Sequence, residues 1–322
     1  MKLWKVFAAV TAVLALASTT GCGSGGQPSS PAASTAASTA GKLSVTVAFY
    51  PFQFIAQRVG GDQVNVTSLT APGSEPHDLE LTPKQVAALG QADLVIFQKG
   101  FQPAVDTALQ NVQVKATVDT ASFLTLKTLE EEGEHAAEGE HSDEEDEPGS
   151  LDPHTWLDPS NMVAIAEHVR DALSAADPAA ASTFSANTTT LIDDLNKLDD
   201  DYRTGLTSCQ RTVFITSHEA FGYLAQRYGL QQVGIRGIEP DTEPTAARIA
   251  QVQKIARENK VTTIFFETLV SPAVAESVAG DLGLVTDVLD PLEGITAQSR
   301  GADYLEVMRS NLTALRKAND CS

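Results

Sequence analysis

The chain alternates twice between short apolar segments rich in β-branched residues and segments with helical periodicity, and one long helical stretch separates the two halves. Alternation of this kind predicts parallel strands, because parallel neighbours need a crossover connection, which is usually a helix. The sequence therefore predicts an α/β fold of two lobes, each a mainly parallel sheet flanked by helices. The predicted strands are residues 43–49, 64–69, 93–97, 112–118, 212–216, 233–238, 261–266 and 284–289.

The long helical stretch, residues 178–206, covers about 29 residues, well above the usual length of a helix in a globular protein. Pro178 suits the first turn of a helix. A helix of this length predicts a stiff connector between the lobes. Its apolar residues repeat along one side at Phe184, Leu191, Leu195, Leu198 and Tyr202. The other predicted helices are residues 82–90, 159–175, 219–228, 243–259, 272–281 and 302–318.

The first residues, 1–21, have the pattern of a signal peptide. Two lysines precede an apolar stretch at 6–17, which is too short to span a bilayer. Cys22 then looks like the acylation site of a bacterial lipoprotein, although Thr19 stands where leucine is usual. A lipid on Cys22 would anchor the mature chain to a membrane surface, whereas ordinary secretion with a free cysteine is the alternative.

Residues 22–41 are small, polar and low in hydrophobicity, which predicts a flexible tether behind the lipidated cysteine. The folded part that follows is expected to divide into an N-terminal lobe at 42–177, the connecting helix at 178–207 and a C-terminal lobe at 208–322. Enough chain remains after the tether for two lobes with separate cores.

The net charge of −20 includes a strongly acidic run at residues 130–147, which holds eleven carboxylates and neither lysine nor arginine. This balance argues against nucleic acid as a partner. We expect the acidic run to be a loop that interrupts the N-terminal lobe.

Two cysteines remain beyond Cys22, at Cys209 and Cys321. Because an exported chain meets an oxidising environment, the two are predicted to form a disulfide, with thiolate binding of a metal as the alternative. The bond would tie the start of the second half to the C-terminus and restrict the unfolded chain.

Three of the six histidines lie in or near loops of the strand–helix pattern: His77 in PGSEPHDLELTP, His154 in LDPHTWLDP and His218 in ITSHEAFGYLA. Asp290 and Glu293 follow the predicted strand at 284–289. Loops at the carboxyl ends of parallel strands are where such folds bind ligands, and imidazole is the commonest metal ligand among side chains. The pattern therefore predicts a metal site built from distant loops.

The carboxylates that flank the histidines are Asp152, Asp158 and Glu219. A bound imidazole usually donates its second N–H to a carboxylate or a carbonyl, and Glu219 is a possible partner of His218. We expect these three acids mainly to cap turns and the starts of helices.

The segments PGSEPHDLELTP, DPHTWLDP, TSHEAFGYLAQRYGL and LDPLEG occur in this order, and with them the chain resembles the metal-binding solute-binding proteins of bacterial zinc and manganese ABC importers. The resemblance covers essentially all of residues 43–322. It implies three histidine ligands, His77, His154 and His218, and a carboxylate as the fourth. Glu293 matches the zinc-type relatives and Asp290 the manganese-type ones, and we favour Glu293.

The resemblance also implies a function. A chain of this kind would capture Zn²⁺ in a cleft between the lobes, outside the cytoplasm, and deliver it to an ABC permease with its ATPase subunit. It would be a monomer anchored to the cell membrane, and not an enzyme. Many zinc-type relatives carry a loop rich in histidine and acids; here His135 and His141 would make a sparse, weakly binding version of it.

Three imidazoles and one carboxylate suit Zn²⁺, which accepts tetrahedral nitrogen and oxygen coordination, whereas Mn²⁺ prefers more oxygen. The alternatives are a manganese-binding importer component, a lipoprotein adhesin and a zinc-dependent hydrolase. A hydrolase would leave the fourth zinc position open to water, and the chain has no HExxH segment.

Overall fold

The computed structural model describes residues 41–128 and 151–322, which belong to one compact unit. The predicted signal peptide 1–21, the lipidation site Cys22 and nearly all of the tether lie outside the described residues. The acidic loop 130–147 with His135 and His141 also lies outside them. In the part of the chain that is described, no helix is long and apolar enough to cross a membrane.

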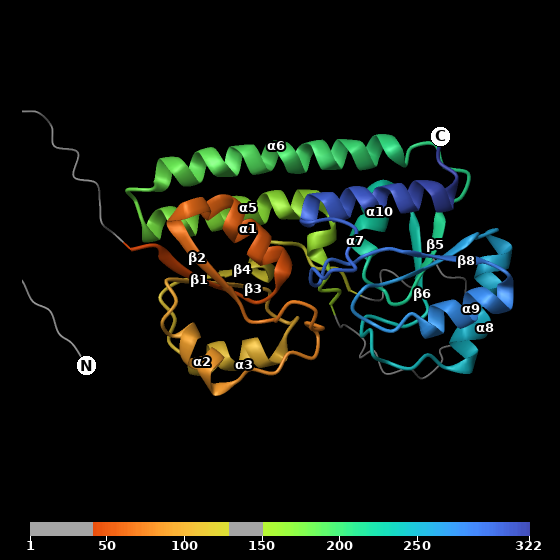
Figure 1. The fold of residues 1–322 in the computed structure, drawn as a ribbon, viewed down its shortest axis with the longest axis horizontal. Helices are drawn as coiled ribbons and strands as arrows, with labels where there is room; N and C mark the ends of the chain where they lie inside the picture. The colour runs from red at the N-terminus through yellow and green to blue at the C-terminus, as the bar shows by residue number, and fades with distance from the viewer. Residues whose placement is uncertain (1–40, 129–150) are drawn as a thin grey trace, which may run out of the picture. The chain divides into compact units, whose positions relative to one another are not determined.

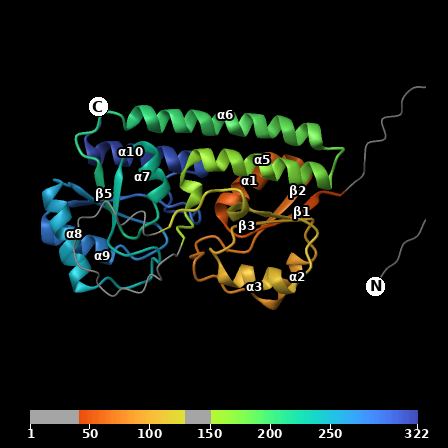
Figure 2. The same ribbon diagram turned by 180° about the vertical axis from the view of Figure 1, so that it is seen from behind.

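The first sheet consists of four parallel strands in the order β2-β1-β3-β4. Helices α1 and α5 contact the sheet, and α2 and α3 lie on its other side (Figures 1 and 2). Because helices cover both faces of the sheet, β3 can be apolar throughout, and all of its residues are buried. The elements are β1 (Leu43–Val47), α1 (Tyr50–Gly60), β2 (Val64–Ser68), α2 (Pro83–Leu89), β3 (Leu94–Phe97), α3 (Pro103–Asn111), β4 (Thr117–Asp119) and α5 (Pro159–Ala176).

The second sheet repeats the arrangement in the order β6-β5-β7-β8, again with every pair parallel. Helices α7 and α10 lie on one side of it, and α8 and α9 lie on the other (Figure 1). The elements are β5 (Val213–Thr216), α7 (Gly222–Tyr228), β6 (Gln231–Gly234), α8 (Ala246–Glu258), β7 (Thr263–Phe266), α9 (Ala273–Leu282), β8 (Val285–Val288) and α10 (Tyr304–Asn319). The predicted fold class is thereby confirmed.

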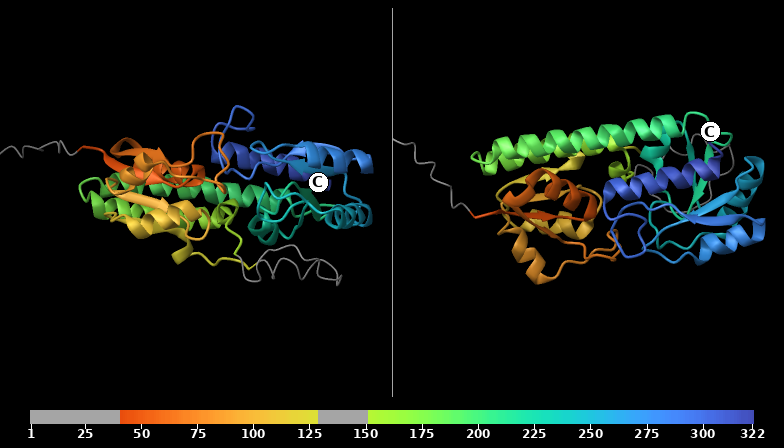
Figure 3. Two further views of the ribbon diagram at one scale, coloured as in Figure 1. Left: turned by 90° about the horizontal axis from the view of Figure 1, so that it is seen from below. Right: turned by 45° about the horizontal axis from the view of Figure 1, so that its top comes forward.

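Helix α6 (Ala181–Gly205) connects the two halves and packs against α1 and α5 at one end and α10 at the other (Figure 3). Its predicted apolar stripe, Phe184 to Tyr202, is fully buried. The Tyr202 hydroxyl donates to the Met308 carbonyl of α10 at 2.6 Å. Because one hydrophobic cluster runs from β1 through α6 to α10, the two lobes share a core at their junction.

Some predicted boundaries were wrong. The connecting helix begins at Ala181, and Pro178 lies in the turn that precedes it. Helices α1 and α3 were not predicted, because short apolar runs fit helices and strands equally well. The predicted strand 112–118 starts too early: β4 begins at Thr117 and ends at Asp119, and the backbone N–H of Val112 still bonds to Ala108 at the end of α3.

The predicted disulfide between Cys209 and Cys321 is confirmed. It joins the segment after α6 to the residues after α10, and 112 residues separate the two cysteines. The bond therefore fixes the C-terminus beside the start of the second sheet.

Candidate metal centre

Three histidines and one glutamate come together between the carboxyl ends of the two sheets. His77 lies in the loop after β2, and His154 precedes a 3₁₀ turn (Thr155–Leu157) that leads into α5. His218 and Glu293 follow β5 and β8. One ligand atom from each of the four lies within 4.8 Å of the others, and all four side chains are buried. The structure thus brings together His77, His154, His218 and Glu293, and it places Asp290 outside the group.

Four of the six distances between the donor atoms fit a tetrahedral ion, and the other two lie within 4.8 Å. The Nε2 atoms of His77 and His154 each lie 3.2 Å from Glu293 Oε1, and that of His218 lies 3.5 Å from it. The Nε2 atoms of His154 and His218 are 3.3 Å apart. Bonds of about 2.0–2.1 Å to a tetrahedral zinc would separate neighbouring donor atoms by about 3.3 Å. The second carboxylate oxygen of Glu293 has no hydrogen-bond partner among the described residues.

Each imidazole has a carboxylate at its other ring nitrogen. Asp152 Oδ1 lies 2.8 Å from His154 Nδ1, and Glu267 Oε1 lies 2.7 Å from His218 Nδ1. Glu239 Oε2 lies 3.3 Å from His77 Nδ1. A carboxylate at Nδ1 keeps the proton on that nitrogen and leaves the lone pair of Nε2 available to a metal. Metal-bound histidines are usually held in this way.

Two of the three flanking acids cap a turn or a helix as predicted, and the third does not. Asp158 caps α5, as expected, by accepting the Ser160 backbone N–H. Asp152 caps a turn, as expected, by accepting the His154 backbone N–H at 2.9 Å, and the same oxygen also contacts the His154 ring. Glu219 pairs with Arg248 at 2.7 Å rather than with His218. The partner of His218 is Glu267, which directly follows β7; that position at a strand end was the available signal, and the sequence reasoning missed it.

Asp290 shapes the turn that presents Glu293. Its carboxylate accepts the Leu292 backbone N–H at 2.8 Å and the Thr268 hydroxyl at 3.2 Å. Leu292 has a φ of +60°, which is unusual for a residue other than glycine and needs such support. The Asp290 carboxylate is therefore engaged in the turn, whereas the Glu293 carboxylate is directed at the histidines.

Two buried glutamines hold the first-lobe loops. The Gln98 side chain donates to the Pro153 carbonyl at 2.6 Å and accepts from the Thr155 hydroxyl, on both sides of His154. The Gln102 side chain donates to the Pro76 carbonyl at 2.9 Å, next to His77. Neither glutamine was predicted, because a lone amide next to a strand carries no distinctive sequence signal.

The carboxylates set the charge state of the imidazoles. Burial by itself lowers the pKa of His77, but hydrogen bonds to Glu239 and Glu293 outweigh it and raise this pKa to about 10. Burial also opposes the charged form of His218, yet Glu267 and Glu293 raise the pKa of this residue well above its ordinary value. Burial acts to raise the pKa of Glu293, and bonds to the three imidazoles lower it well below its ordinary value. Without metal, the site therefore holds protons in the place of the cation.

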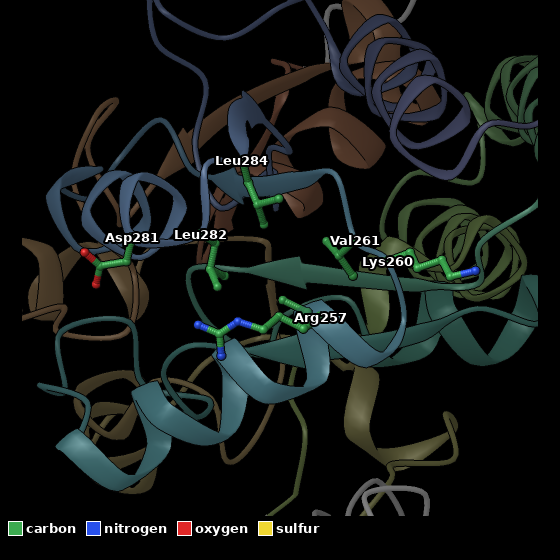
Figure 4. A pocket seen from close by; sticks show the side chains of 7 residues that line it. Arg257, Lys260, Val261, Asp281, Leu282 and Leu284 are labelled. Atoms are coloured by element: carbon green, nitrogen blue, oxygen red, sulfur yellow. The ribbon is translucent and has the colours of Figure 1, made fainter.

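A pocket of the second lobe lies at the opposite edge of its sheet, where β7 and β8 begin (Figure 4). Arg257 and Lys260 line it from the end of α8, and Asp281 and Leu282 line it from the end of α9. None of the three histidines or the glutamate of the buried group lines this pocket. We regard the buried histidine–glutamate group, and not this pocket, as the functional site.

Comparison with known proteins places the chain in a family. Residues 45–318 match the family model of the zinc-uptake complex component A, a periplasmic protein. The zinc-binding lipoprotein AdcA of Streptococcus pneumoniae is 38% identical over 287 residues, which are 87% of this chain and 56% of that protein. The chain thus spans about half the length of the first curated relatives that it matches.

A relative of similar length is the high-affinity zinc uptake system protein ZnuA of Bacillus subtilis. It is 34% identical over 280 residues, which cover 85% of this chain and 87% of that protein. The crystal structure of the Zn(II)-bound ZnuA-like domain of pneumococcal AdcA superposes with a TM-score of 0.72 at 36% identity, covering 87% of this chain and all of that one. The chain belongs to the family of the zinc-uptake complex component A.

Proposed function

We propose that the chain is the extracytoplasmic zinc-binding component of an ABC importer, and that His77, His154, His218 and Glu293 are the ligands of its cargo. The observation that carries this proposal is the convergence of four buried donor atoms within 4.8 Å of one another. Buried ionisable groups are unfavourable unless they are paired or bind a metal. A divalent cation bound here would replace protons that the site otherwise holds.

The donor set favours zinc over the alternatives. Three nitrogens and one oxygen suit Zn²⁺, which accepts tetrahedral coordination, whereas Mn²⁺ prefers more oxygen donors and a higher coordination number. A zinc hydrolase would keep one coordination position open for water, and Glu293 Oε1 lies where a fourth ligand would be. A relative that carries zinc in its solved structure adds support for the same cargo.

Membership of this family supports a role in capture and delivery. The zinc-bound chain would dock as a monomer on an ABC permease, whose ATPase subunit drives transport. A lipid on Cys22 would hold the chain at the extracytoplasmic surface of the membrane that contains the permease. The tether 22–41 would link the lipid to the folded lobes. The relatives named as lipoproteins support this anchoring.

The test uses the mature chain from Cys22 onward, purified without lipid and stripped of metal. Calorimetric titration with Zn²⁺ and with Mn²⁺ should give one tight zinc site per chain and a preference for zinc. His154→Ala should weaken zinc binding greatly, because His154 is fully buried at the centre of the group. The matched control is His168→Ala, which removes an exposed imidazole of α5 and should leave zinc binding unchanged. Equal zinc affinity in all three proteins, or a preference for manganese, would overturn the proposal.

A further inference from the structure

The three carboxylate partners of the imidazoles differ in where they lie. Asp152 is two residues from His154, and Glu267 follows a strand adjacent to the one before His218, so each supports a histidine of its own lobe. Both are buried. Glu239, in contrast, lies in the second lobe and contacts His77 of the first, and its side chain is 60% exposed. The His77–Glu239 pair therefore joins the two lobes at the solvent side of the site, beside a hydrogen bond between Asp78 and Asp241.

Glu239 belongs to the segment 238–245 between β6 and α8. The base of this segment is fixed, since the Ile235 and Arg236 backbone N–H groups donate to Thr216 and Ser217, and the Gly237 carbonyl accepts from Glu219. Beyond Gly237 the segment has neither helical nor strand structure, and most of its residues are exposed. The far end of the segment is anchored as well, because Thr245 caps α8 and Arg248 donates to the Gly234 carbonyl. Only the exposed residues between these two ends are free to move.

The rest of the junction between the lobes is tied by buried contacts. The Trp156 indole N–H donates to the Pro291 carbonyl at 2.7 Å, and the Tyr304 hydroxyl donates to the Trp156 carbonyl at 2.7 Å. The Tyr223 hydroxyl donates to the Asp152 carbonyl at 2.9 Å. Separation of the lobes would break all of these buried bonds, whereas movement of segment 238–245 would break only two contacts at the surface, that of Glu239 with His77 and the hydrogen bond between Asp241 and Asp78. The less costly way to open the site is by this segment.

From these contacts we propose that Glu239 is a positioning residue that closes the metal site. By accepting the Nδ1–H of His77 it orients the ring so that Nε2 faces Glu293, and it couples segment 238–245 to the bound cation. When the contact breaks, His77 is the ligand that turns away first, because its two fellow imidazoles keep their buried partners. The inference rests on the proposed function, since it assumes that the cation bound here is the cargo.

The test measures zinc release from Glu239→Ala, with Glu243→Ala as the matched control. Glu243 is an exposed acid of the same segment, so its loss changes the charge equally without removing the partner of His77. Zinc should dissociate about 10-fold faster from Glu239→Ala, as is typical when the hydrogen-bond partner of a metal ligand is lost. The control should change by less than about 2-fold, because exposed charges contribute little. Release is followed by stopped-flow transfer of Zn²⁺ to a chelating dye.

Two further measurements separate positioning from a merely structural role. In a double-mutant cycle, Glu239→Ala should have no additional effect on zinc affinity when His77 is already alanine. Zinc should slow hydrogen exchange of segment 238–245 in the original protein and not in Glu239→Ala. Equal effects of the two acidic substitutions, or an effect of Glu239→Ala that persists without His77, would refute the inference. Failure of the unmodified protein to bind zinc would refute the proposed function instead, so the two failures are distinguishable.

Discussion

The affinity for zinc should depend steeply on pH across the neutral range, because the site must release protons to accept the cation. The raised pKa values of His77 and His218 mean that both imidazoles are protonated at pH 7 in the metal-free protein. A metal ligand must be neutral at the coordinating nitrogen. Glu293, with its lowered pKa, is already ionised and contributes no proton. Zinc binding at neutral pH should therefore release at least two protons.

The sign and size of the effect follow directly. Each proton displaced changes the apparent binding constant about 10-fold per pH unit, so two change it about 100-fold. Affinity falls as the pH falls, and between pH 8 and pH 6 the loss should be on the order of 10⁴-fold, or about 5.5 kcal/mol. Because the pKa of His77 is about 10, affinity should still be rising at pH 8.

Unperturbed imidazoles would behave differently. With an ordinary pKa of about 6.5, they would be largely neutral above pH 7.5, and the affinity would reach a plateau there. Competition against a chelator, corrected for the protonation of the chelator, measures the affinity at each pH. Calorimetry in two buffers of different ionisation enthalpy counts the released protons at pH 7.5. A plateau above pH 7.5 with less than one proton released would refute the reasoning.

Three other variants, two single and one double, test the surroundings of the site and the fold. Asp152→Ala should lower zinc affinity about 10–100-fold, measured by chelator competition, because it removes the buried partner of the His154 ring. Tyr202→Phe should destabilise the protein by about 1–2 kcal/mol in urea unfolding, with unchanged zinc affinity, because it removes a buried hydrogen bond from α6 to α10. Replacing Cys209 and Cys321 together by serine should lower the free energy of unfolding by up to about 4–5 kcal/mol, since the bond closes a loop across 112 residues; an unchanged urea midpoint would contradict that estimate.

Much of the fold was predictable because its signals are local. Strands such as β3 and β7 show as short apolar runs, and α6 shows its 3.6-residue stripe over its whole length. Helix α1 was missed because its apolar residues are too many and too closely spaced to distinguish a helix from a buried strand. Periodicity is informative only where one side of an element is polar.

The sequence by itself determined which types of ligand atom the site has, and where along the chain they lie. Imidazoles at strand ends, with two carboxylates after the last strand, already indicated a metal site of mixed nitrogen and oxygen donors. The tertiary structure decided that Glu293 joins the histidines while Asp290 holds the turn. It also decided that Glu267 and Glu239 support the imidazoles.

The physical reason is distance along the chain. Glu293 is 216 residues from His77, and Glu267 is 49 residues from His218. Which side chains of such pairs meet depends on how the two sheets pack around α6 and α10. It also depends on which residue of a turn is directed at the site, and a shift of one or two positions changes that residue. No local pattern encodes either. Residue type and spacing can thus nominate the donors of a site, and only the packed lobes determine their partners.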